Sequence, residues 1–409
     1  MDKDMKDFLS VLRRSIHGRN SEPFPVDAAP EKLVQIAKLH KVLPLIVQSE
    51  KDTEEFSSHR IFAPASKEAL SSAVAQIKRT ESFKFLYCKM NENGIFPLVM
   101  KGIVCRGLYG EKGDYRASSD EDILIKKEDF ESIDKFLRNE GFQPDKDNLT
   151  EKEKDFIQEV TYTSQNTDLR LEVHLNLFGK DDLFRRKMNE FFEDVHDFFR
   201  EEKSGDVSIR TMNHTKHFLV LVLHALKHLT VSGFGIRMVC DILLYMEKYY
   251  EEIDFDYIIA SLREVNGESF LADLIFIGNE YLGFSLPETG EMNCPEELLE
   301  DILESGIYGN YTQARRTSVH MVHSAFAERS TSSKFGKAGL LFDAIFPPKE
   351  RLRELCPEVE RKPWLIFDVY IKRMGRFIAH NRQSGNNLAA ESIKIGQKRI
   401  ALLKKYKLL

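Results

Sequence analysis

The chain has 409 residues, 42% of them hydrophobic, which is enough for about two or three domains with a large core. Its 59 basic and 65 acidic residues leave a formal net charge of −6, so charge does not indicate a nucleic-acid partner. The N-terminus lacks the pattern of a signal peptide, and no run of about 18 uncharged apolar residues predicts a membrane span. Five scattered cysteines without a CxxC pair favour neither a disulfide framework nor a zinc site. We therefore expect a soluble, cytoplasmic protein.

Residues 1–94 are predicted to form a helical segment, because apolar side chains recur there at helical spacing. In the second half of this segment, Leu70, Val74 and Ile77 fall on one face of the predicted helix. Asn93 and Gly94 supply a stop signal, since glycine adopts the left-handed conformation that ends many helices.

The period of the pattern changes in the next part of the chain. The apolar run at 96–101 predicts a short buried strand, with a helix starting directly after it at 102–109. Residues 111–118 are predicted to be a loop, and 119–126 a second strand. An amphipathic helix is predicted to follow at 127–142.

Two further runs, 160–168 and 169–177, predict a β-hairpin. The second run alternates strictly, with Leu171, Val173, Leu175 and Leu177 on one face and Arg170, Glu172, His174 and Asn176 on the other. Beyond residue 180 the chain is predicted to return to helix. Turn-rich stretches at 285–297 and 328–339 are the candidate linkers, and a basic amphipathic helix ends the chain.

The segment Asp120-Glu121-Asp122 is the first candidate for chemistry. Residues two apart in a strand project from the same face, so Asp120 and Asp122 are expected side by side. Two neighbouring ionised carboxylates repel each other, and a divalent cation relieves the repulsion. Carboxylate oxygens, waters and substrate phosphates are the ligands that magnesium prefers, and manganese accepts the same set.

Glu172 is a third carboxylate, on the polar face of its alternating strand. If that strand lies beside 119–126, Glu172 completes a site for two metal ions that activate a hydroxyl and stabilise a leaving pyrophosphate. Upstream, Lys101 and Gly102 join a strand to a helix, where free N–H groups and a lysine charge suit phosphates. Three loop residues before the aspartates are further candidates for phosphate contacts: Arg116, Ser118 and Ser119.

A lone Asp-x-Asp is common on protein surfaces and is weak evidence for a metal site. The prediction is strengthened by the order of the elements along the chain: strand, Lys-Gly, helix, loop, Asp-x-Asp, helix, hairpin and carboxylate. The segments LVMKG, YRASSDEDILI and LRLEVHLNLF together resemble the uncharacterised nucleotidyltransferase family of the polymerase-beta-like superfamily. The resemblance implies that Asp120, Asp122 and Glu172 are metal ligands. It also implies that Lys101, Gly102 and Arg116 contact the triphosphate.

The resemblance has two departures. Lys101-Gly102 stands where the superfamily usually has Gly-Ser, and Glu121 replaces an apolar residue between the aspartates. Glu121 is expected on the opposite face of the sheet, which must then be partly open or give Glu121 a partner.

The fold implied is α+β, with a small mixed-sheet nucleotidyltransferase core embedded between helical regions. The expected division is a helical segment at 1–94, the catalytic core at 95–180, a helical domain at 181–327 and a C-terminal helical region at 328–409.

The activity implied is metal-dependent transfer of a nucleoside monophosphate from a nucleoside triphosphate to a hydroxyl, with Mg²⁺ or Mn²⁺ and release of pyrophosphate. The acceptor is a protein, an RNA or a small molecule, which the sequence does not distinguish. The alternative is a non-catalytic regulatory module of the same fold, such as an antitoxin-like partner.

Weaker similarity continues downstream, at His224, His228, Arg237 and Asp241. The two histidines lie four apart without an intervening acid, so a zinc-protease motif is not indicated. With Lys227 they either line the nucleotide cleft or make polar contacts within the helical domain. The i, i+4 spacing of Arg237 and Asp241 predicts an intrahelical ion pair, with a substrate-facing Arg237 as the alternative.

The basic C-terminal helix also has two interpretations. Cations are favourable near a helix C-terminus in any protein, whereas RNA binding would need aromatic stacking groups nearby, and only Tyr406 is available. Trp364 is expected in a core rather than on a stacking platform.

Overall fold

A computed structural model describes residues 1–18, 20–180, 182–307, 314–315, 318–319, 321–322 and 388–409. Its contacts define two compact units, one formed by 1–225 and 236–292 and the other by 226–235 and 293–409. The predicted linker at 328–339 and Trp364 lie outside the described residues. Among the helices that are described, none is long and apolar enough to cross a membrane.

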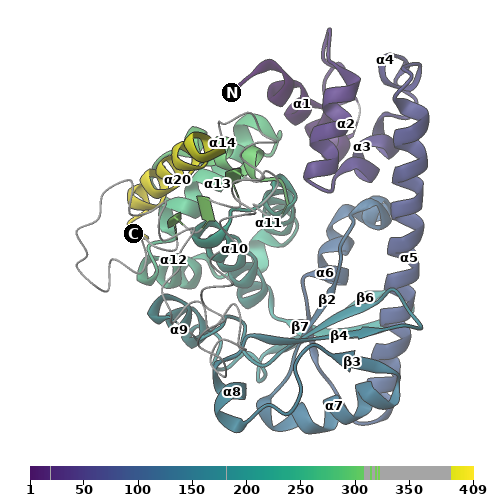
Figure 1. Cartoon of the computed structure of the whole chain (residues 1–409), viewed down its shortest axis with the longest axis vertical. Helices are drawn as coiled ribbons and strands as arrows, with labels where there is room; N and C mark the ends of the chain where they lie inside the picture. The colour runs from purple at the N-terminus through teal and green to yellow at the C-terminus, as the bar shows by residue number, and fades with distance from the viewer. Residues whose placement is uncertain (19, 181, 308–313, 316–317, 320, 323–387) are drawn as a thin grey trace. The chain divides into compact units, whose positions relative to one another are not determined.

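The first unit contains a seven-stranded mixed sheet with the order β3-β4-β5-β2-β1-β7-β6 (Figure 1). The strands are β1 (Leu98–Met100), β2 (Glu121–Leu124), β3 (Phe142–Pro144), β4 (Glu159–Ser164), β5 (Arg170–His174), β6 (Phe199–Ser204) and β7 (Val207–Met212). Strand β2 pairs antiparallel with β1 and parallel with β5. The mixed sheet and the helices around it confirm the predicted α+β class.

The centre of the sheet is the core of this unit. Val99, Ile123 and Val173 are neighbours across β1, β2 and β5, and none of the three side chains is exposed. Strands β4 and β5 form the predicted antiparallel hairpin. The apolar residues on one face of the alternating strand therefore belong to the core, and its polar residues face the other way.

The expectation that the chain returns to helix directly after residue 180 is wrong at 199–212. Strands β6 and β7 form an antiparallel hairpin there, and β7 joins β1 in parallel through Val99 and Thr211. The turn between the strands contains Gly205, whose φ of 63° suits glycine. Strand β6 lies at the edge of the sheet and is rich in charged residues, which protect an exposed edge from pairing with other molecules. Because it has no apolar run, the sequence pattern did not predict it as a strand.

The first unit also contains helices, some packed on the sheet and others packed on one another. They are α1 (Lys3–His17), α2 (Pro30–Leu39), α3 (Leu43–Glu50), α4 (Glu54–Ser57), α5 (Phe62–Glu92), α6 (Gly102–Arg106), α7 (Phe130–Asn139), α8 (Glu151–Phe156), α9 (Leu183–Glu190), α10 (His214–Val231, whose last residues belong to the second unit), α11 (Ile236–Tyr249), α12 (Phe255–Glu264) and α13 (Glu268–Tyr281). Helix α6 packs against β1 and β2, α7 against β3, and α5 against β7. A 3₁₀ helix, η1 (Gly107–Tyr115), occupies most of the predicted loop.

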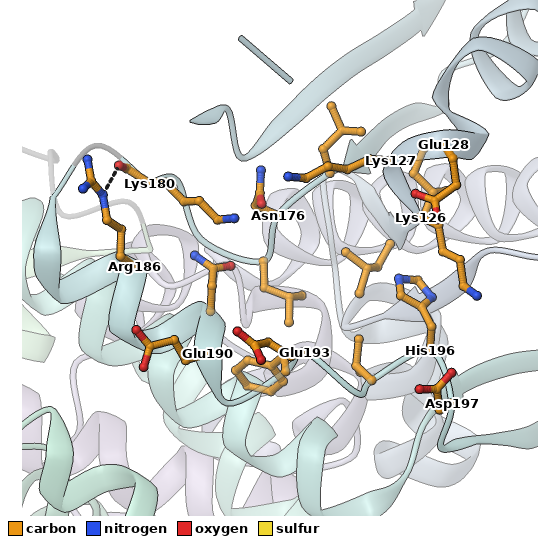
Figure 2. Close-up of a pocket in the computed structure, with 17 residues that line it drawn as sticks. Lys126, Lys127, Glu128, Asn176, Lys180, Arg186, Glu190, Glu193, His196 and Asp197 are labelled. Carbon is orange, nitrogen blue, oxygen red and sulfur yellow. Dashed lines mark hydrogen bonds between the residues drawn. The ribbon is translucent and has the colours of Figure 1, made fainter. Parts of the chain in front are cut away.

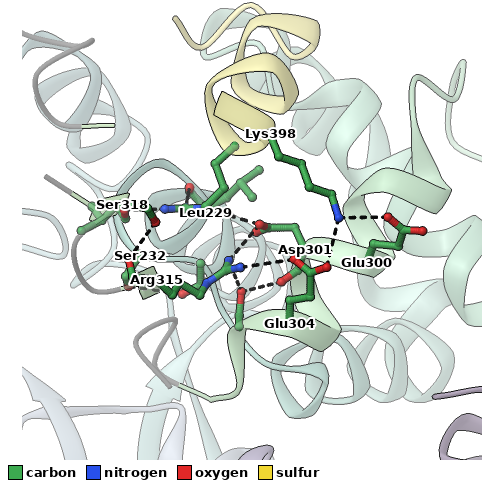
Figure 3. A network of polar contacts seen from close by, with 12 residues as sticks. Leu229, Ser232, Glu300, Asp301, Glu304, Arg315, Ser318 and Lys398 are labelled. Atoms are coloured by element: carbon green, nitrogen blue, oxygen red, sulfur yellow. Dashed lines mark hydrogen bonds and ion pairs between the residues drawn. The ribbon is translucent and has the colours of Figure 1, made fainter. Parts of the chain in front are cut away.

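The second unit contains α14 (Pro295–Ser305) and the C-terminal helix α20 (Leu388–Lys405), which confirms the helix predicted at the end of the chain. Figure 3 shows Lys398 of α20 between Glu300 and Glu304 of α14, at 3.0 and 3.1 Å. Lys405 pairs in the same way with Glu297. These basic side chains thus join α20 to α14, which favours a structural role over RNA binding.

Candidate functional site

The parallel pairing of β2 with β5 brings two of the predicted carboxylates together. Asp122 and Glu172 are direct partners across the two strands, so their side chains leave the same face of the sheet. Asp122 is buried, and Glu172 is partly open to solvent. The sequence predicted that Glu172 joins the site only if its strand lies beside 119–126, and the structure shows this pairing.

Two cationic or polar side chains reach the Asp122 carboxylate. Lys101 Nζ lies 2.7 Å from Asp122 Oδ1, and His174 Nε2 lies 3.0 Å from the same oxygen. Asp122, Glu172 and His174 each offer a ligand atom, and these atoms all lie within 4.8 Å of one another. His174 therefore touches the site and fixes the orientation of Asp122.

Asp120 lies immediately before the first residue of β2 and is half-buried. Its carboxylate accepts a hydrogen bond of 3.1 Å from the Ser119 hydroxyl. It is outside the group of three whose ligand atoms are close together, but its charge acts on Glu172 and on Lys101.

The carboxylates of Asp120, Asp122 and Glu172 act on one another electrostatically, and the single ammonium of Lys101 does not balance their three potential negative charges. Burial, and then the charges of Asp122 and Asp120, raise the pKa of Glu172 to about 7. Burial also acts to raise the pKa of Asp122, but Lys101 and His174 outweigh it and hold that pKa below its usual range. Burial disfavours the charged Lys101, yet the carboxylates around it raise its pKa overall, so it remains an ammonium. Additional positive charge would therefore be favourable at this position.

The backbone of Lys101 is strained, with φ 44° and ψ −120°, a conformation that non-glycine residues rarely adopt. Its N–H donates to His217 Nε2 at 3.4 Å, and His217 Nδ1 lies 3.1 Å from the Thr211 hydroxyl, which donates to the Val99 carbonyl. Burial, and then the Arg200 charge, lower the pKa of His217 to about 3, so the ring is neutral and accepts at Nε2. Sequence reasoning missed Thr211 and His217 because the β6–β7 hairpin was not predicted.

The fold and these contacts can be set beside known proteins. A family described as uncharacterised nucleotidyltransferase matches residues 27–283. The chain belongs to this family. No curated protein matches the chain, and no solved structure does. The matched range contains every strand of the sheet and the three candidate carboxylates, Asp120, Asp122 and Glu172.

Glu121, the departure from the family pattern, lies on the opposite face of β2 and has a partner. Its carboxylate accepts from Arg106 Nη2 at 2.6 Å and from the Ile103 N–H at 2.9 Å, and Glu121 and Arg106 are both buried. A Cβ at position 102 would lie 2.1 Å from Glu121 Oε2. Gly102 is thus required by Glu121, whatever its role toward a phosphate.

Ser118 and Ser119 point into different surroundings. The Ser118 hydroxyl accepts from Arg106 Nη1 at 2.9 Å, and the Ser118 N–H donates to Gln76 Oε1 at 2.8 Å. Ser118 therefore belongs to the buried network around Glu121. Ser119 stays beside Asp120, where a contact with a nucleotide remains a prediction.

Arg116 and Asp241 form a buried ion pair with two hydrogen bonds, at 2.9 and 2.6 Å. Tyr109 also donates to Asp241, at 2.9 Å. Arg237 instead donates to the Ala117 carbonyl, so the predicted intrahelical pair of Arg237 with Asp241 is wrong. The partner of Asp241 is therefore Arg116, which lies 125 positions away in the sequence, and helical spacing could not predict it. Arg116 would have to leave this pair to contact a triphosphate.

The remaining candidates, His224, Lys227 and His228, lie on α10 and are half-buried. His224 belongs to the first unit, whereas Lys227 and His228 belong to the second. Their contact with a nucleotide stays a prediction.

Proposed function

We propose that the chain transfers a nucleoside monophosphate from a nucleoside triphosphate to a hydroxyl acceptor and releases pyrophosphate. The observation that carries the proposal is the pairing of Asp122 with Glu172 on adjacent parallel strands, with Asp120 just before the first of them. Membership of the nucleotidyltransferase family supports the reaction class. The regulatory-module alternative is less consistent with a site in which all three carboxylates are present.

The donor set suits a divalent cation. Asp120, Asp122 and Glu172 would hold it through oxygen atoms, as Mg²⁺ prefers, and the imidazole of His174 suits Mn²⁺ as well. Burial and the charges of Asp122 and Asp120 raise the pKa of Glu172, and a bound cation would oppose both effects. When bound, divalent cations would neutralise phosphate charge and make an acceptor hydroxyl more acidic.

The other side chains would position the reactants. Lys101 would provide a fixed positive charge for phosphate oxygens, held in place by the His217 contact to its backbone. His174 would orient Asp122, and the Glu172 carboxylate would take the proton of the acceptor hydroxyl. Such positioning and charge neutralisation account for most of the catalysis in phosphoryl and nucleotidyl transfer.

Calorimetry with ATP, GTP, CTP and UTP, with and without Mg²⁺, tests the proposal. We expect Mg²⁺-dependent binding of at least one nucleotide by the wild type, weakened by about tenfold or more in Asp120→Asn/Asp122→Asn, because charge-assisted ligands are lost. Asp206→Asn removes an exposed carboxylate from the β6–β7 turn and should bind as the wild type does.

Circular dichroism should show that both variants remain folded. Pyrophosphate release, assayed with candidate hydroxyl acceptors, should disappear in the Asp120→Asn and Asp122→Asn single variants. Full activity in both single variants would contradict the assignment. A folded wild type that binds no nucleotide would favour the regulatory-module alternative.

A further inference from the structure

A pocket of about 620 Å³ opens at the ends of β2 and β5 (Figure 2). One part of its wall is the chain that continues from β2, residues 124–128. A second part continues from β5, at 175–177 and Lys180. The segment from Arg186 to Asp197, which begins in α9, closes the other side. The pocket thus lies at the carboxyl ends of two neighbouring parallel strands, a common position for ligands in sheets with parallel strands.

The same two strands carry the paired carboxylates. A strand advances about 3.3 Å per residue, so Leu124 in the pocket wall follows Asp122 by roughly 7 Å and Leu175 follows Glu172 by roughly 10 Å. A ligand of monosaccharide size in this pocket therefore lies close to Asp122 and Glu172, at a separation similar to its own length.

The pocket wall has a cationic side. In Figure 2 the ammonium groups of Lys127 and Lys180 point toward Asn176 from opposite sides. Lys127 pairs with Asp155 at 2.6 Å, whereas no described carboxylate lies within ion-pair distance of Lys180. Burial, and then the charge of Lys127, lower the pKa of Lys180. The charges of Asp155 and Glu193 act on Lys180, but no ion pair with a described carboxylate holds its ammonium, which can therefore take an anionic ligand.

The segment that closes the other side contributes Glu190 and Glu193, together with Arg186. Phe192 of this segment and Leu124 and Leu175 of the strand side add apolar surface. Carboxylates only accept hydrogen bonds and therefore suit hydroxyl groups, while an apolar surface suits the C–H face of a sugar ring. The ammonium groups of Lys127 and Lys180 suit an anionic group, and the carboxylates of Glu190 and Glu193 suit hydroxyls of the same ligand.

We propose that this pocket binds an anionic polyol, a sugar that bears a phosphate or a carboxylate, as the acceptor of nucleotidyl transfer. The anionic group lies between Lys127 and Lys180, and hydroxyls face Glu190 and Glu193. The acceptor role rests on the proposed function. In the reaction, a polyol hydroxyl oxygen bonds to the α-phosphorus, the bond from that phosphorus to the bridging oxygen breaks, pyrophosphate leaves, and Glu172 takes the hydroxyl proton.

The binding test uses the full chain without nucleotide. Glucose 6-phosphate, gluconate and neutral glucose are titrated by calorimetry, so that the phosphate, the carboxylate and the uncharged polyol are compared. We expect at least one of the anions to bind and glucose to bind at least about tenfold more weakly, the factor that corresponds to one charge-assisted contact. Whichever anion binds more tightly identifies the source of the charge.

The variant Lys180→Gln removes the ammonium that pairs with no described carboxylate, and Lys152→Gln removes an exposed ammonium from α8 as a matched control. Lys180→Gln should weaken anion binding by about tenfold, Lys152→Gln should leave it unchanged, and Lys180→Arg should largely restore it. Thermal melting should show that all three variants are folded.

The proposal is overturned if neither anion binds, if glucose binds as tightly as the anions, or if Lys180→Gln and Lys152→Gln behave alike. Mg²⁺-dependent nucleotide binding is measured on the same samples and should be unaffected by Lys180→Gln. Lys180-dependent anion binding in a chain that binds no nucleotide would overturn the proposed function and the acceptor role, while the anion site would stand.

Discussion

The Glu121 carboxylate determines which residue can occupy position 102. Its Oε2 accepts the Ile103 N–H, and the same oxygen lies where a side chain at position 102 would begin. Gly102 has φ +20°, which adds backbone strain for any other residue. The glycine that the sequence assigned to phosphate binding thus has a structural reason of its own.

Gly102→Ala should therefore destabilise the protein by about 1–3 kcal/mol, the usual cost of overpacking a filled interior. Gly107→Ala is the matched control, because its added Cβ would lie 3.7 Å from the nearest side-chain atom and its φ of −61° suits alanine. Urea denaturation of the two variants measures the difference. Equal stabilities would show that Glu121 does not occupy this space.

Helix α5 shows how an apolar pattern can mark the wrong face. Leu70, Val74 and Ile77 do share a face, but it is exposed, with Leu70 63% accessible. The buried face contains small and polar residues in its first half, including Ala69 and Ala73. Small side chains permit close approach of neighbouring elements, so the core-facing side of this first half has few large apolar residues, whereas the second half of the helix buries Phe83, Leu86, Tyr87 and Met90.

Two leucines on α5 test this assignment. Leu86 is buried at 4% exposure, so Leu86→Ala should cost about 2–5 kcal/mol by leaving a cavity. Leu70→Ala makes the same chemical change on the exposed face and should change the free energy of unfolding by less than about 0.5 kcal/mol. Comparable losses in the two variants, measured by urea denaturation, would mean that the Leu70 face is covered.

At the scale of the whole chain, both units bury charged groups in structural ion pairs, and the first unit also buries a carboxylate in the candidate site. In the first unit the buried carboxylate Asp122 lies in the candidate site, whereas in the second Asp301 lies between two guanidinium groups (Figure 3). Asp301 Oδ1 is 2.8 Å from Arg315 and 3.5 Å from Arg399. Burial lowers the pKa of Arg399 to about 10, and the charge of Asp301 opposes this effect. The second network connects α14 and α20 and has a structural role.

Asp301→Asn should lower the free energy of unfolding by about 3–5 kcal/mol, because it leaves buried guanidinium groups without their carboxylate. Glu304→Gln is the control on the same helix, where the side chain is 47% exposed and the expected loss is at most about 1 kcal/mol. Denaturation followed by circular dichroism distinguishes the two. A loss in Asp301→Asn no larger than in the control would contradict the buried network.

The sequence by itself determined the elements that carry the site. Alternation placed Glu172 and His174 on the polar face of one strand, and the Asp-x-Asp pattern marked the start of another. The Lys-Gly junction marked a strand that leads into a helix. The position of Glu121 between the aspartates predicted that it either faces a partly open surface or has a partner. These are local properties, because the side-chain period of a strand depends only on neighbouring residues.

Tertiary structure alone decided which elements meet. Parallel pairing of β2 with β5 set Asp122 opposite Glu172. Because η1 packs against α11, Asp241 forms its ion pair with Arg116 rather than with Arg237. The β6–β7 hairpin supplied Thr211, which completes the contacts that hold the backbone of Lys101. Such partners are far apart in the chain, and the choice among them depends on the packing of the whole unit rather than on any local pattern.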